Sequence, residues 1–261
     1  MPCHPVRSRS PPKETISRWP CKPCTGSRYD VWQAPQALPW QMDTGGAARI
    51  GELDCYVSSP LQPIAAGVLV LAPDLWGLDG GSVRGACDEL AAAGYLVVAP
   101  DFSRRGQELP DSGLDESERG QEWLQRFKRA HKCKLLDASL RFLRKAGMGR
   151  VGAVGFSCGA WATAQLSRDT AQVQASIWCY PSRLSSPELE SCDAESELAA
   201  AVAAPTLILP SRNSPELYAD GDLANAMRSN GVETEVVYFK GASIEWLAEQ
   251  ADGWFAKHLS K

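Results

Sequence analysis

The sequence predicts an α/β fold built on a largely parallel, doubly wound β-sheet. Two short, continuously apolar runs, Ala65–Leu71 and Tyr95–Ala99, are typical of strands that are buried on both faces. The segment between them, Val83–Ala93, repeats apolar residues at helical spacing, and Gly94 follows where such a helix would end. Because strand and helix patterns alternate along the chain, we expect helices on both faces of the sheet.

The other elements follow in the same alternating order. Arg49–Val57 alternates as a first strand or hairpin does, Phe102–Gly113 is a polar loop, and Glu118–Arg144 has a helical pattern with an expected break near Cys133. The last elements are predicted as strands at Arg150–Val154, Ala175–Cys179, Thr206–Leu209 and Glu233–Phe239, and as helices at Ala160–Leu166, Glu216–Ser229 and Ile244–Leu259.

Composition divides the chain into a leader, residues 1–46, and one domain, residues 47–261. The leader holds six of the 27 Lys and Arg residues, three of the 31 acidic residues and eight of the 18 prolines. It shows no helical or strand periodicity, so we expect it to be extended or disordered. No secretory hydrophobic segment is visible. We therefore expect a cytoplasmic protein, with organelle targeting by the Arg- and Ser-containing leader as the alternative.

The overall composition excludes several classes of protein. The 261 residues are 44% hydrophobic and 22% charged, with a formal net charge of -4. A nucleic-acid-binding module normally carries a basic excess, so no nucleic-acid partner is expected. No apolar run approaches the roughly 20 residues of a membrane span, so no membrane partner is expected either. The sequence leaves the oligomeric state open.

The chain contains nine cysteines, an odd number that indicates reduced thiols in an intracellular compartment. Cys21 and Cys24 form a C-x-x-C pair, with Cys3 and His4 further upstream. A structural zinc site needs four ligands at paired spacings, and only one such pair is present. We therefore expect no metal and no cofactor, and we interpret the leader thiols as exposed. A metal-binding leader is the alternative.

The motif that carries chemistry is the G-x-S-x-G sequence Gly155-Phe156-Ser157-Cys158-Gly159, between a predicted strand and a predicted helix. A nucleophile elbow requires this context. The glycines permit a tight turn, and the following helix directs free N–H groups to the same point. We expect Ser157 to be a nucleophile and the Cys158 N–H to be an oxyanion donor. A glycine-rich turn that serves packing alone is the alternative.

Three longer segments occur in an order and at spacings that belong together. They are Leu69–Gly77 (LVLAPDLWG), Leu90–Asp101 (LAAAGYLVVAPD) and Val151–Gly159 (VGAVGFSCG). In these segments the chain resembles the dienelactone hydrolase family, over most of residues 47–261. The resemblance implies an α/β-hydrolase fold and a hydrolase of carboxylic esters or lactones. The leader's Cys-Lys-Pro-Cys and Gly51–Val57 (GELDCYV) are similar to the eukaryotic branch.

The same resemblance implies roles for residues around Ser157. Family members usually carry Cys at this position, so a hydroxyl replaces a thiol here. Asp74 matches a carboxylate that gates the nucleophile, and Leu75 would supply the second oxyanion N–H. Arg104 or Arg105 matches an arginine that binds an acidic substrate. Aromatic residues expected near the same edge of the sheet either line a pocket or belong to the core: Trp76, Trp161, Tyr180 and Trp246.

The expected triad partners of Ser157 are absent from their places in the sequence. In α/β-hydrolases the acid and the histidine follow the serine in chain order. The acid position after Thr206–Leu209 holds Asn213 or Ser214, depending on the gap, and the histidine position holds Ile244. The three histidines of the chain are all poorly placed to substitute: His4, His131 and His258.

Other reactive side chains near the motif are weaker candidates. An unshifted carboxylate is a poor base for a serine proton. The Cys158 thiol is interpreted as a packing group, because an elbow directs the N–H of this residue to the substrate; a reactive thiol is the alternative. The carboxylates considered are Asp220, Asp222 and Glu245.

Two functions therefore compete. The first is a hydrolase of small-molecule esters or lactones with Ser157 as nucleophile, weak or inactive because loss of triad members costs several orders of magnitude. The second is a non-catalytic relative that binds a small ligand or a protein partner. Ile244 and the Asn213-Ser214 pair motivate the second function.

Overall fold

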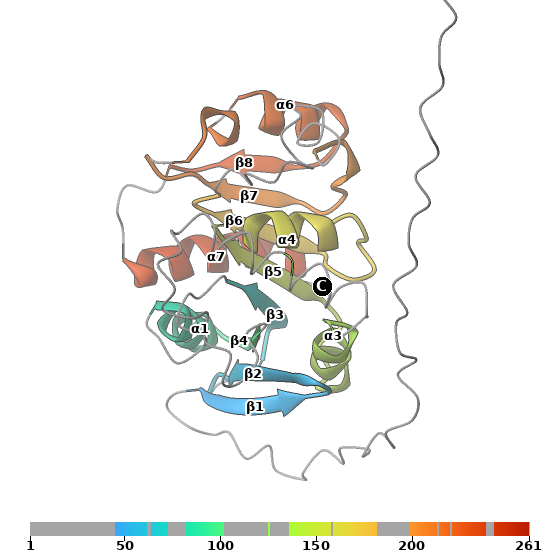
Figure 1. The fold of residues 1–261 in the computed structure, drawn as a ribbon, viewed down its shortest axis with the longest axis vertical. Coiled ribbons are helices and arrows are strands. Elements are labelled where there is room, and N and C mark those ends of the chain that lie inside the picture. The colour runs from blue at the N-terminus through green and yellow to red at the C-terminus, as the bar shows by residue number, and fades with distance from the viewer. Residues whose placement is uncertain are drawn as a thin grey trace, which may run out of the picture. The chain divides into compact units, whose positions relative to one another are not determined.

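The computed structural model describes residues 45–61, 64–72, 82–101, 125, 136–157, 159–181, 199–212, 214–219, 221–238 and 243–260. In these ranges eight strands form one sheet in the order β1-β2-β4-β3-β5-β6-β7-β8 (Figure 1). The strands are β1 (Gly46–Ile50), β2 (Leu53–Ser58), β3 (Ala66–Leu71), β4 (Tyr95–Asp101), β5 (Val151–Phe156), β6 (Ala175–Cys179), β7 (Thr206–Leu209) and β8 (Thr234–Val236). The helices are α1 (Ser82–Ala92), α3 (Leu136–Lys145), α4 (Gly159–Leu166), α6 (Asp222–Ser229) and α7 (Ile244–Leu259).

The sheet is largely parallel, as predicted. Strands β3 to β8 run in one direction. The antiparallel pairings among the described strands are those of β2 with β1 and with β4. The chain passes from β3 outward to β4 and then returns past β3 to β5, so the strand order reverses beside β3. In open α/β sheets, ligands bind outside the carboxyl ends of the strands at this kind of reversal.

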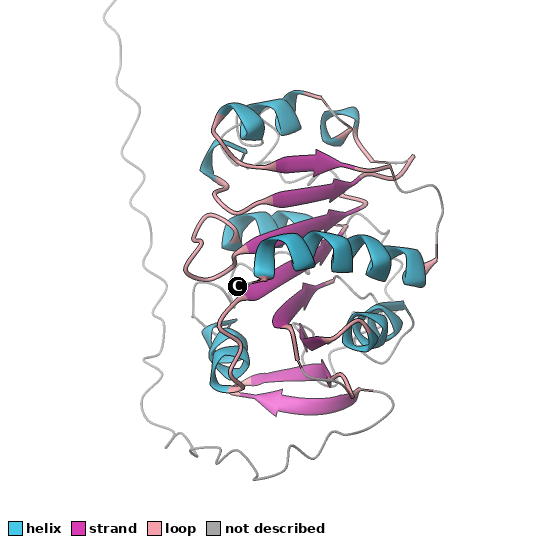
Figure 2. Cartoon of the chain, turned by 180° about the vertical axis from the view of Figure 1, so that it is seen from behind, coloured by secondary structure: helices cyan, strands magenta, loops and turns pink. Residues whose placement is uncertain are grey.

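Helices cover both faces of the sheet (Figures 1 and 2). Helices α1 and α7 pack with one set of buried residues, and α3 and α4 pack with the set on the opposite face. Helix α6 packs beside α4 at the β7–β8 end of the sheet. Connections between parallel strands are right-handed. Helix α1 connects β3 outward to β4 and therefore covers one face, whereas α3 precedes β5 on the other side of β3 and covers the opposite face.

Strand β3 shows how the sequence pattern produces a doubly covered sheet. Val68 and Val70 belong to the core on the α1–α7 face, and Leu69 and Leu71 belong to the core on the α3–α4 face. All four side chains are fully buried. Successive residues of a strand point to opposite faces, so a strand covered on both sides must be apolar at every position.

The predicted boundaries were confirmed for Ala175–Cys179, Thr206–Leu209 and Ile244–Leu259. The single helix predicted over Glu216–Ser229 was wrong. The structure has a short 3₁₀ helix, Glu216–Tyr218, followed by α6. Ala219 and Gly221 between them have extended backbone angles, which interrupt the helical hydrogen bonds.

The first predicted strand is a hairpin of β1 and β2, closed at Gly51, whose φ is +63°. Glycine takes this left-handed conformation without a steric penalty. The helix predicted over Glu118–Arg144 is described continuously only from Leu136. Residues 1–44, which make up most of the predicted leader (residues 1–46), and the predicted loop Phe102–Gly113 lie outside the described residues. Strand β1 begins at Gly46, the last residue of that predicted leader.

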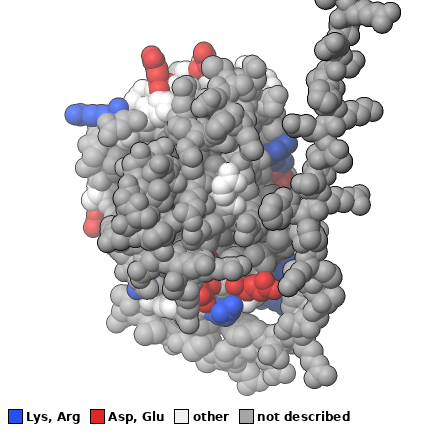
Figure 3. Space-filling model, in the orientation of Figure 1, with Lys and Arg blue, Asp and Glu red and all other residues white. Residues whose placement is uncertain are grey.

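Among the described ranges, no helix combines the length and the apolar character that crossing a bilayer would require. On the face shown in Figure 3, the coloured acidic and basic side chains occur in small separate groups. This view therefore shows no single broad patch of one sign among the described residues.

Candidate active site

Ser157 lies at the carboxyl edge of the sheet, which is the edge where the parallel strands end. It directly follows β5 and precedes α4, and its side chain is partly exposed. Its φ is 51°, in the left-handed region that non-glycine residues rarely occupy. The Ser157 N–H donates to the Cys179 carbonyl at 3.0 Å, and the Ser157 carbonyl accepts from the Ala160 N–H at 3.1 Å. The backbone of the turn is therefore held on both sides.

The two glycines of the motif are required by close backbone contacts. A Cβ on Gly155 would lie 2.3 Å from the Gly159 carbonyl oxygen and 2.4 Å from Thr163 Oγ1. A Cβ on Gly159 would lie 2.0 Å from the Leu71 carbonyl oxygen. Helix α4 thus begins against the ends of both β5 and β3, closer than any side chain allows. A strand, a tight turn and a helix therefore follow one another here, which is the context that a nucleophile elbow requires.

Tyr180 occupies the corresponding position on the neighbouring strand. Phe156 pairs with Cys179 in the β5–β6 register, so Ser157 and Tyr180 each follow a paired residue. The Tyr180 N–H donates to the Leu209 carbonyl at 2.7 Å, and its ring centroid lies 5.6 Å from that of Phe156. Its φ is 35°, and within the described part of the chain only Ser157 and Tyr180 are non-glycine residues with positive φ.

The model of the dienelactone hydrolase family matches residues 53–257, which is most of the chain. The chain belongs to the dienelactone hydrolase family. A solved structure from Klebsiella pneumoniae, described as a candidate dienelactone hydrolase, superposes with a TM-score of 0.63 at 20% identity, covering 82% of this chain and 98% of that one. At this identity the likeness shows the α/β-hydrolase fold alone.

Two relatives show closer sequence similarity over shorter stretches. Hydrolase pyvD of Aspergillus violaceofuscus is 31% identical over 118 residues, which are 44% of this chain and 46% of that protein. The carboxymethylenebutenolidase homolog of Xenopus tropicalis is 28% identical over 137 residues, which are 52% of this chain and 54% of that protein. The chain thus spans about half the length of each of these relatives.

Ser214, one of the two residues predicted for the acid position, lies in the turn after β7. The Ser211 N–H donates to Ser214 Oγ at 3.0 Å, the two hydroxyl oxygens are 3.3 Å apart, and the Ser214 N–H donates to the Ser211 carbonyl at 3.1 Å. Serine side chains stabilise such turns by bonding to nearby backbone groups. The Ser214 hydroxyl therefore has a structural role in its own loop. Asn213 lies outside the described residues.

Ile244, the residue predicted for the histidine position, is the first residue of α7. The Ser243 side chain caps this helix by accepting from the Trp246 N–H at 3.4 Å. The Ile244 Cδ1 would be 3.3 Å from a Cβ on Gly85, so the side chain packs closely against α1. Ile244 also packs with the core set that contains Phe156 and Tyr180. The Ile244 side chain is therefore a packing residue between α7 and α1.

His258 lies at the opposite, amino edge of the sheet, where the parallel strands begin. The Arg150 guanidinium, one residue before β5, donates to the His258 carbonyl at 3.0 Å. Since Ser157 follows the sixth and last residue of β5, the strand separates the two ends by about 20 Å. His258 is the only histidine among the described residues, because His4 and His131 lie outside them.

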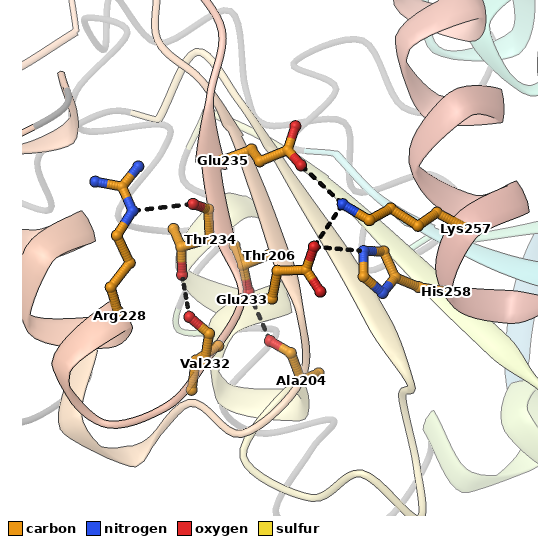
Figure 4. A network of polar contacts seen from close by, with 9 residues as sticks. All are labelled: Ala204, Thr206, Arg228, Val232, Glu233, Thr234, Glu235, Lys257 and His258. Carbon is orange, nitrogen blue, oxygen red and sulfur yellow. Dashed lines mark hydrogen bonds and ion pairs between the residues drawn. The ribbon is translucent and has the colours of Figure 1, made fainter.

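The surroundings of His258 are those of a structural histidine (Figure 4). Its ring centroid lies 4.2 Å from that of Trp254, and its Nε2 lies 3.9 Å from Glu233 Oε1. Lys257 Nζ lies 2.5 Å from Glu233 Oε1 and 3.0 Å from Glu235 Oε1. Burial lowers the pKa of His258, and the Glu233 carboxylate opposes this shift in part. At neutral pH the ring is therefore an uncharged packing group.

Most of the other predicted site residues lie outside the described residues, so they stay predictions. Trp246 is described; it is half-buried at the start of α7 and packs with the core set that contains Tyr180. Trp161 is half-buried in α4 and packs on the opposite core. The residues outside the description are Asp74, Leu75, Trp76, Arg104, Arg105 and Cys158.

The three described cysteines are buried. Cys55, Cys87 and Cys179 are free thiols. Burial raises the pKa of the Cys55 thiol to about 12 and also raises the pKa of Cys87 and Cys179. Within the described residues no three His, Cys, Asp or Glu side chains come together as a metal site would require. The leader pair, Cys21 and Cys24, lies outside the description.

Sequence reasoning missed two residues that shape this edge of the sheet. Ser211 pairs with Ser214, and an S-x-x-S spacing directly after a strand is a local signal for such a turn. Thr163, in the second turn of α4, places its Oγ1 2.4 Å from where a Cβ on Gly155 would lie. No local signal predicts the role of Thr163, because the contact depends on how closely the helix approaches the strand.

Proposed function

We propose that the protein is a degenerate member of the dienelactone hydrolase family in which Ser157 reacts with small-molecule esters or lactones and turnover is slow. The observation that carries this proposal is the left-handed Ser157 backbone between Gly155 and Gly159, which are in contacts that exclude a Cβ. A strained backbone that its surroundings impose is typical of functional sites. Packing alone does not call for a serine at this position.

Slow turnover follows from the residues at the two partner positions. A serine hydroxyl needs a general base to take its proton, and the base in turn needs an acid to orient it. Ser214 or Asn213 stands in place of the acid, and Ile244 stands in place of the histidine. Removing a member of such a triad lowers kcat by roughly 10⁴-fold or more, and what persists comes from the oxyanion hole and binding.

The pocket around Ser157 is proposed by resemblance to the family. The N–H groups of Cys158 and Leu75 would bind the oxyanion of the tetrahedral intermediate. Asp74 would lie beside the nucleophile, and Arg104 or Arg105 would bind an acidic group of the substrate. The apolar walls of the pocket would come from Trp76, Tyr180 and Trp246. We also propose that the chain belongs to the eukaryotic branch of the family and acts in the cytoplasm without a cofactor.

A serine-directed fluorophosphonate probe tests the nucleophile directly. It phosphonylates an activated serine and displaces fluoride, so one adduct per chain is expected on the full-length protein. Ser157→Ala should lose the adduct completely. Ser243→Ala is the matched control, because Ser243 lies at the same edge of the sheet but caps α7. Equal labelling of the parent and Ser157→Ala would refute Ser157 as the nucleophile.

The second candidate is a non-catalytic binding protein. The contacts of Ser214 with Ser211 and of Ile244 with α1 favour it, because both partner positions are used for packing. On this alternative, the double variant Ile244→His, Ser214→Asp should gain ester hydrolysis that the parent lacks. A parent that already hydrolyses esters at rates typical of intact triads would exclude it. The readout is release of p-nitrophenolate from p-nitrophenyl acetate.

A further inference from the structure

We infer that Asn230 is a site of spontaneous covalent modification, where the side-chain amide is converted through a cyclic imide into aspartate or isoaspartate. This inference goes beyond the proposed function and does not depend on Ser157. Asn230 is the C-terminal cap of α6, it is exposed, and Gly231 follows it. The chain contains three asparagines, Asn213, Asn225 and Asn230, and among them only Asn230 precedes a glycine.

The reaction needs only water as a second reactant. The Gly231 amide nitrogen forms a bond to the Asn230 side-chain carbonyl carbon, the bond from that carbon to the side-chain nitrogen breaks, and ammonia leaves with the Gly231 amide proton. Water then opens the cyclic imide at either carbonyl. One opening gives aspartate, and the other routes the main chain through the former side chain as isoaspartate. Glycine favours ring closure because no Cβ hinders its nitrogen.

Asn225, inside the same helix, shows why the position of the residue matters. Its N–H donates to the Gly221 carbonyl at 3.1 Å, and its side-chain oxygen accepts from the Arg228 guanidinium at 3.2 Å. Ring closure at Asn225 would require the middle of α6 to unfold, and the following residue, Ala226, carries a Cβ. At Asn230 only the end of the helix must open. Helix ends open at a lower free energy than helix interiors.

A Schellman motif closes α6 and holds Asn230 out of the reactive geometry. The Gly231 N–H donates to the Arg228 carbonyl at 2.9 Å, and the Val232 N–H donates to the Met227 carbonyl at 3.0 Å. Gly231 has a φ of 81°, the left-handed conformation that the motif uses. The Asn230 ψ of 8° turns the Gly231 nitrogen away from the side-chain carbonyl carbon. Rotation about this bond breaks both hydrogen bonds, so the cap must open before the ring can close.

Both products weaken the same cap. Aspartate places a negative charge at the C-terminal end of a helix, where the helix dipole is also negative. Isoaspartate adds a carbon atom to the main chain and changes the spacing of the two capping hydrogen bonds. Arg228 ties this end of α6 to β8, since its Nε donates to the Thr234 carbonyl at 3.0 Å (Figure 4). We therefore expect a converted chain to unfold at a lower urea concentration than the parent.

Incubation of the full-length chain in mildly alkaline buffer at physiological temperature tests the site. Peptide mapping by mass spectrometry measures conversion at each asparagine, and an isoaspartyl methyltransferase detects the isoaspartate product. We expect conversion at Asn230 and none at Asn225, which is the internal control. Asn230→Gln should lose the product, because the longer glutamine side chain would have to close a larger ring. No conversion at Asn230 over several weeks, or equal conversion at Asn225, would overturn the inference.

The role of the cap is tested with the Asn-Gly pair left intact. Val232 is 8% exposed and belongs to the same core cluster as Met227, so Val232→Ala removes the apolar contact that accompanies the motif. Conversion at Asn230 should rise by about threefold or more. Val83→Ala in α1 is the matched control, because Val83 is 9% exposed and packs in a different cluster. It should leave the conversion rate unchanged.

The unfolded chain gives the rate without the cap. In urea, which unfolds α6, conversion at Asn230 should be at least about tenfold faster than in the folded chain. Equal rates in the two states, or equal effects of Val232→Ala and Val83→Ala, would overturn control by the cap. Equal urea midpoints for converted and parent chains would overturn the expected effect of the products on stability.

Discussion

At the amino edge of the sheet, charged side chains pair with one another. Lys257 bridges Glu233 and Glu235, and His258 packs on Trp254 beside them. At the carboxyl edge, the elbow is held by backbone contacts around Gly155 and Gly159 that leave no space for a side chain. One edge therefore depends on side-chain pairs that solvent screens, and the other on a close fit of main-chain atoms. Substitutions should have small effects at the first edge and large effects at the second.

The largest effect is expected for Gly155→Ala. The new Cβ would lie 2.3 Å from the Gly159 carbonyl oxygen, so β5 and α4 must separate. We expect the free energy of unfolding to fall by about 3 kcal/mol or more, together with loss of fluorophosphonate labelling. Urea unfolding measures the change.

Gly253→Ala on α7 is the matched control for Gly155→Ala. No atom lies within 4 Å of the Cβ that this substitution adds. Because alanine has the higher helix propensity, the control should be stabilising by up to about 1 kcal/mol. Equal effects of the two substitutions would contradict the view that the backbone contacts at Gly155 leave no space for a Cβ.

A smaller loss is expected for Tyr95→Phe, near the amino edge. The Tyr95 hydroxyl donates to Asp252 Oδ1 at 2.8 Å, and its ring lies edge-on to Phe255. Phenylalanine keeps the ring contact and removes the hydrogen bond, so thermal or urea unfolding should show a loss of about 1 kcal/mol. Tyr238→Phe is the control, because that side chain is 50% exposed, and it should change stability little. A loss above 3 kcal/mol for Tyr95→Phe would contradict the expectation that substitutions at the amino edge have smaller effects than those at the carboxyl edge.

Strain at Ser157 is measured by comparing Ser157→Gly with Ser157→Ala. Both variants lose the hydroxyl and should lose labelling. Glycine takes a φ of 51° without the penalty that a Cβ incurs, so the glycine variant should be the more stable of the two by about 1 kcal/mol. Equal stabilities in urea unfolding would show that the turn stores no strain.

The smallest effect is a pH dependence at His258. Burial lowers the pKa of His258 from 6.5, so the unfolded chain binds a proton more readily than the folded one. Stability should therefore decline as the pH falls below about 6.5, until the folded ring is also protonated. His258→Gln should remove this part of the decline in pH-dependent unfolding. An unchanged pH profile would mean that Glu233 compensates for burial of the ring.

Much of the fold was predictable because its signals are local. Buried strands such as Ala175–Cys179 are continuous apolar runs, and α7 has a regular apolar face. The helix predicted over Glu216–Ser229 failed for a local reason as well. Gly221 and the extended Ala219 break it, and helical periodicity alone does not reveal such an interruption.

The candidate site was predictable to a lesser degree. The G-x-S-x-G motif gave the position of Ser157, and family resemblance gave the positions of Ser214 and Ile244. The contacts of those two side chains were not predictable, because they depend on residues whose positions in space the sequence does not specify. Ser214 bonds to Ser211 through a turn, and Ile244 packs on Gly85 of a helix far away in the chain.

By itself, the sequence determined the alternation of strands and helices, the parallel sheet and the presence of a serine in a glycine-flanked turn. Only the tertiary structure decided that the turn is tight, because Gly159 owes its close contact to Leu71 on β3, a strand distant in sequence. It also decided that His258 lies at the amino edge, opposite Ser157. Helix α7 begins at Ile244 and runs back along the sheet, so that His258 near its end contacts Arg150. Local patterns follow from backbone sterics and apolar spacing, whereas these distances follow from how separate elements pack.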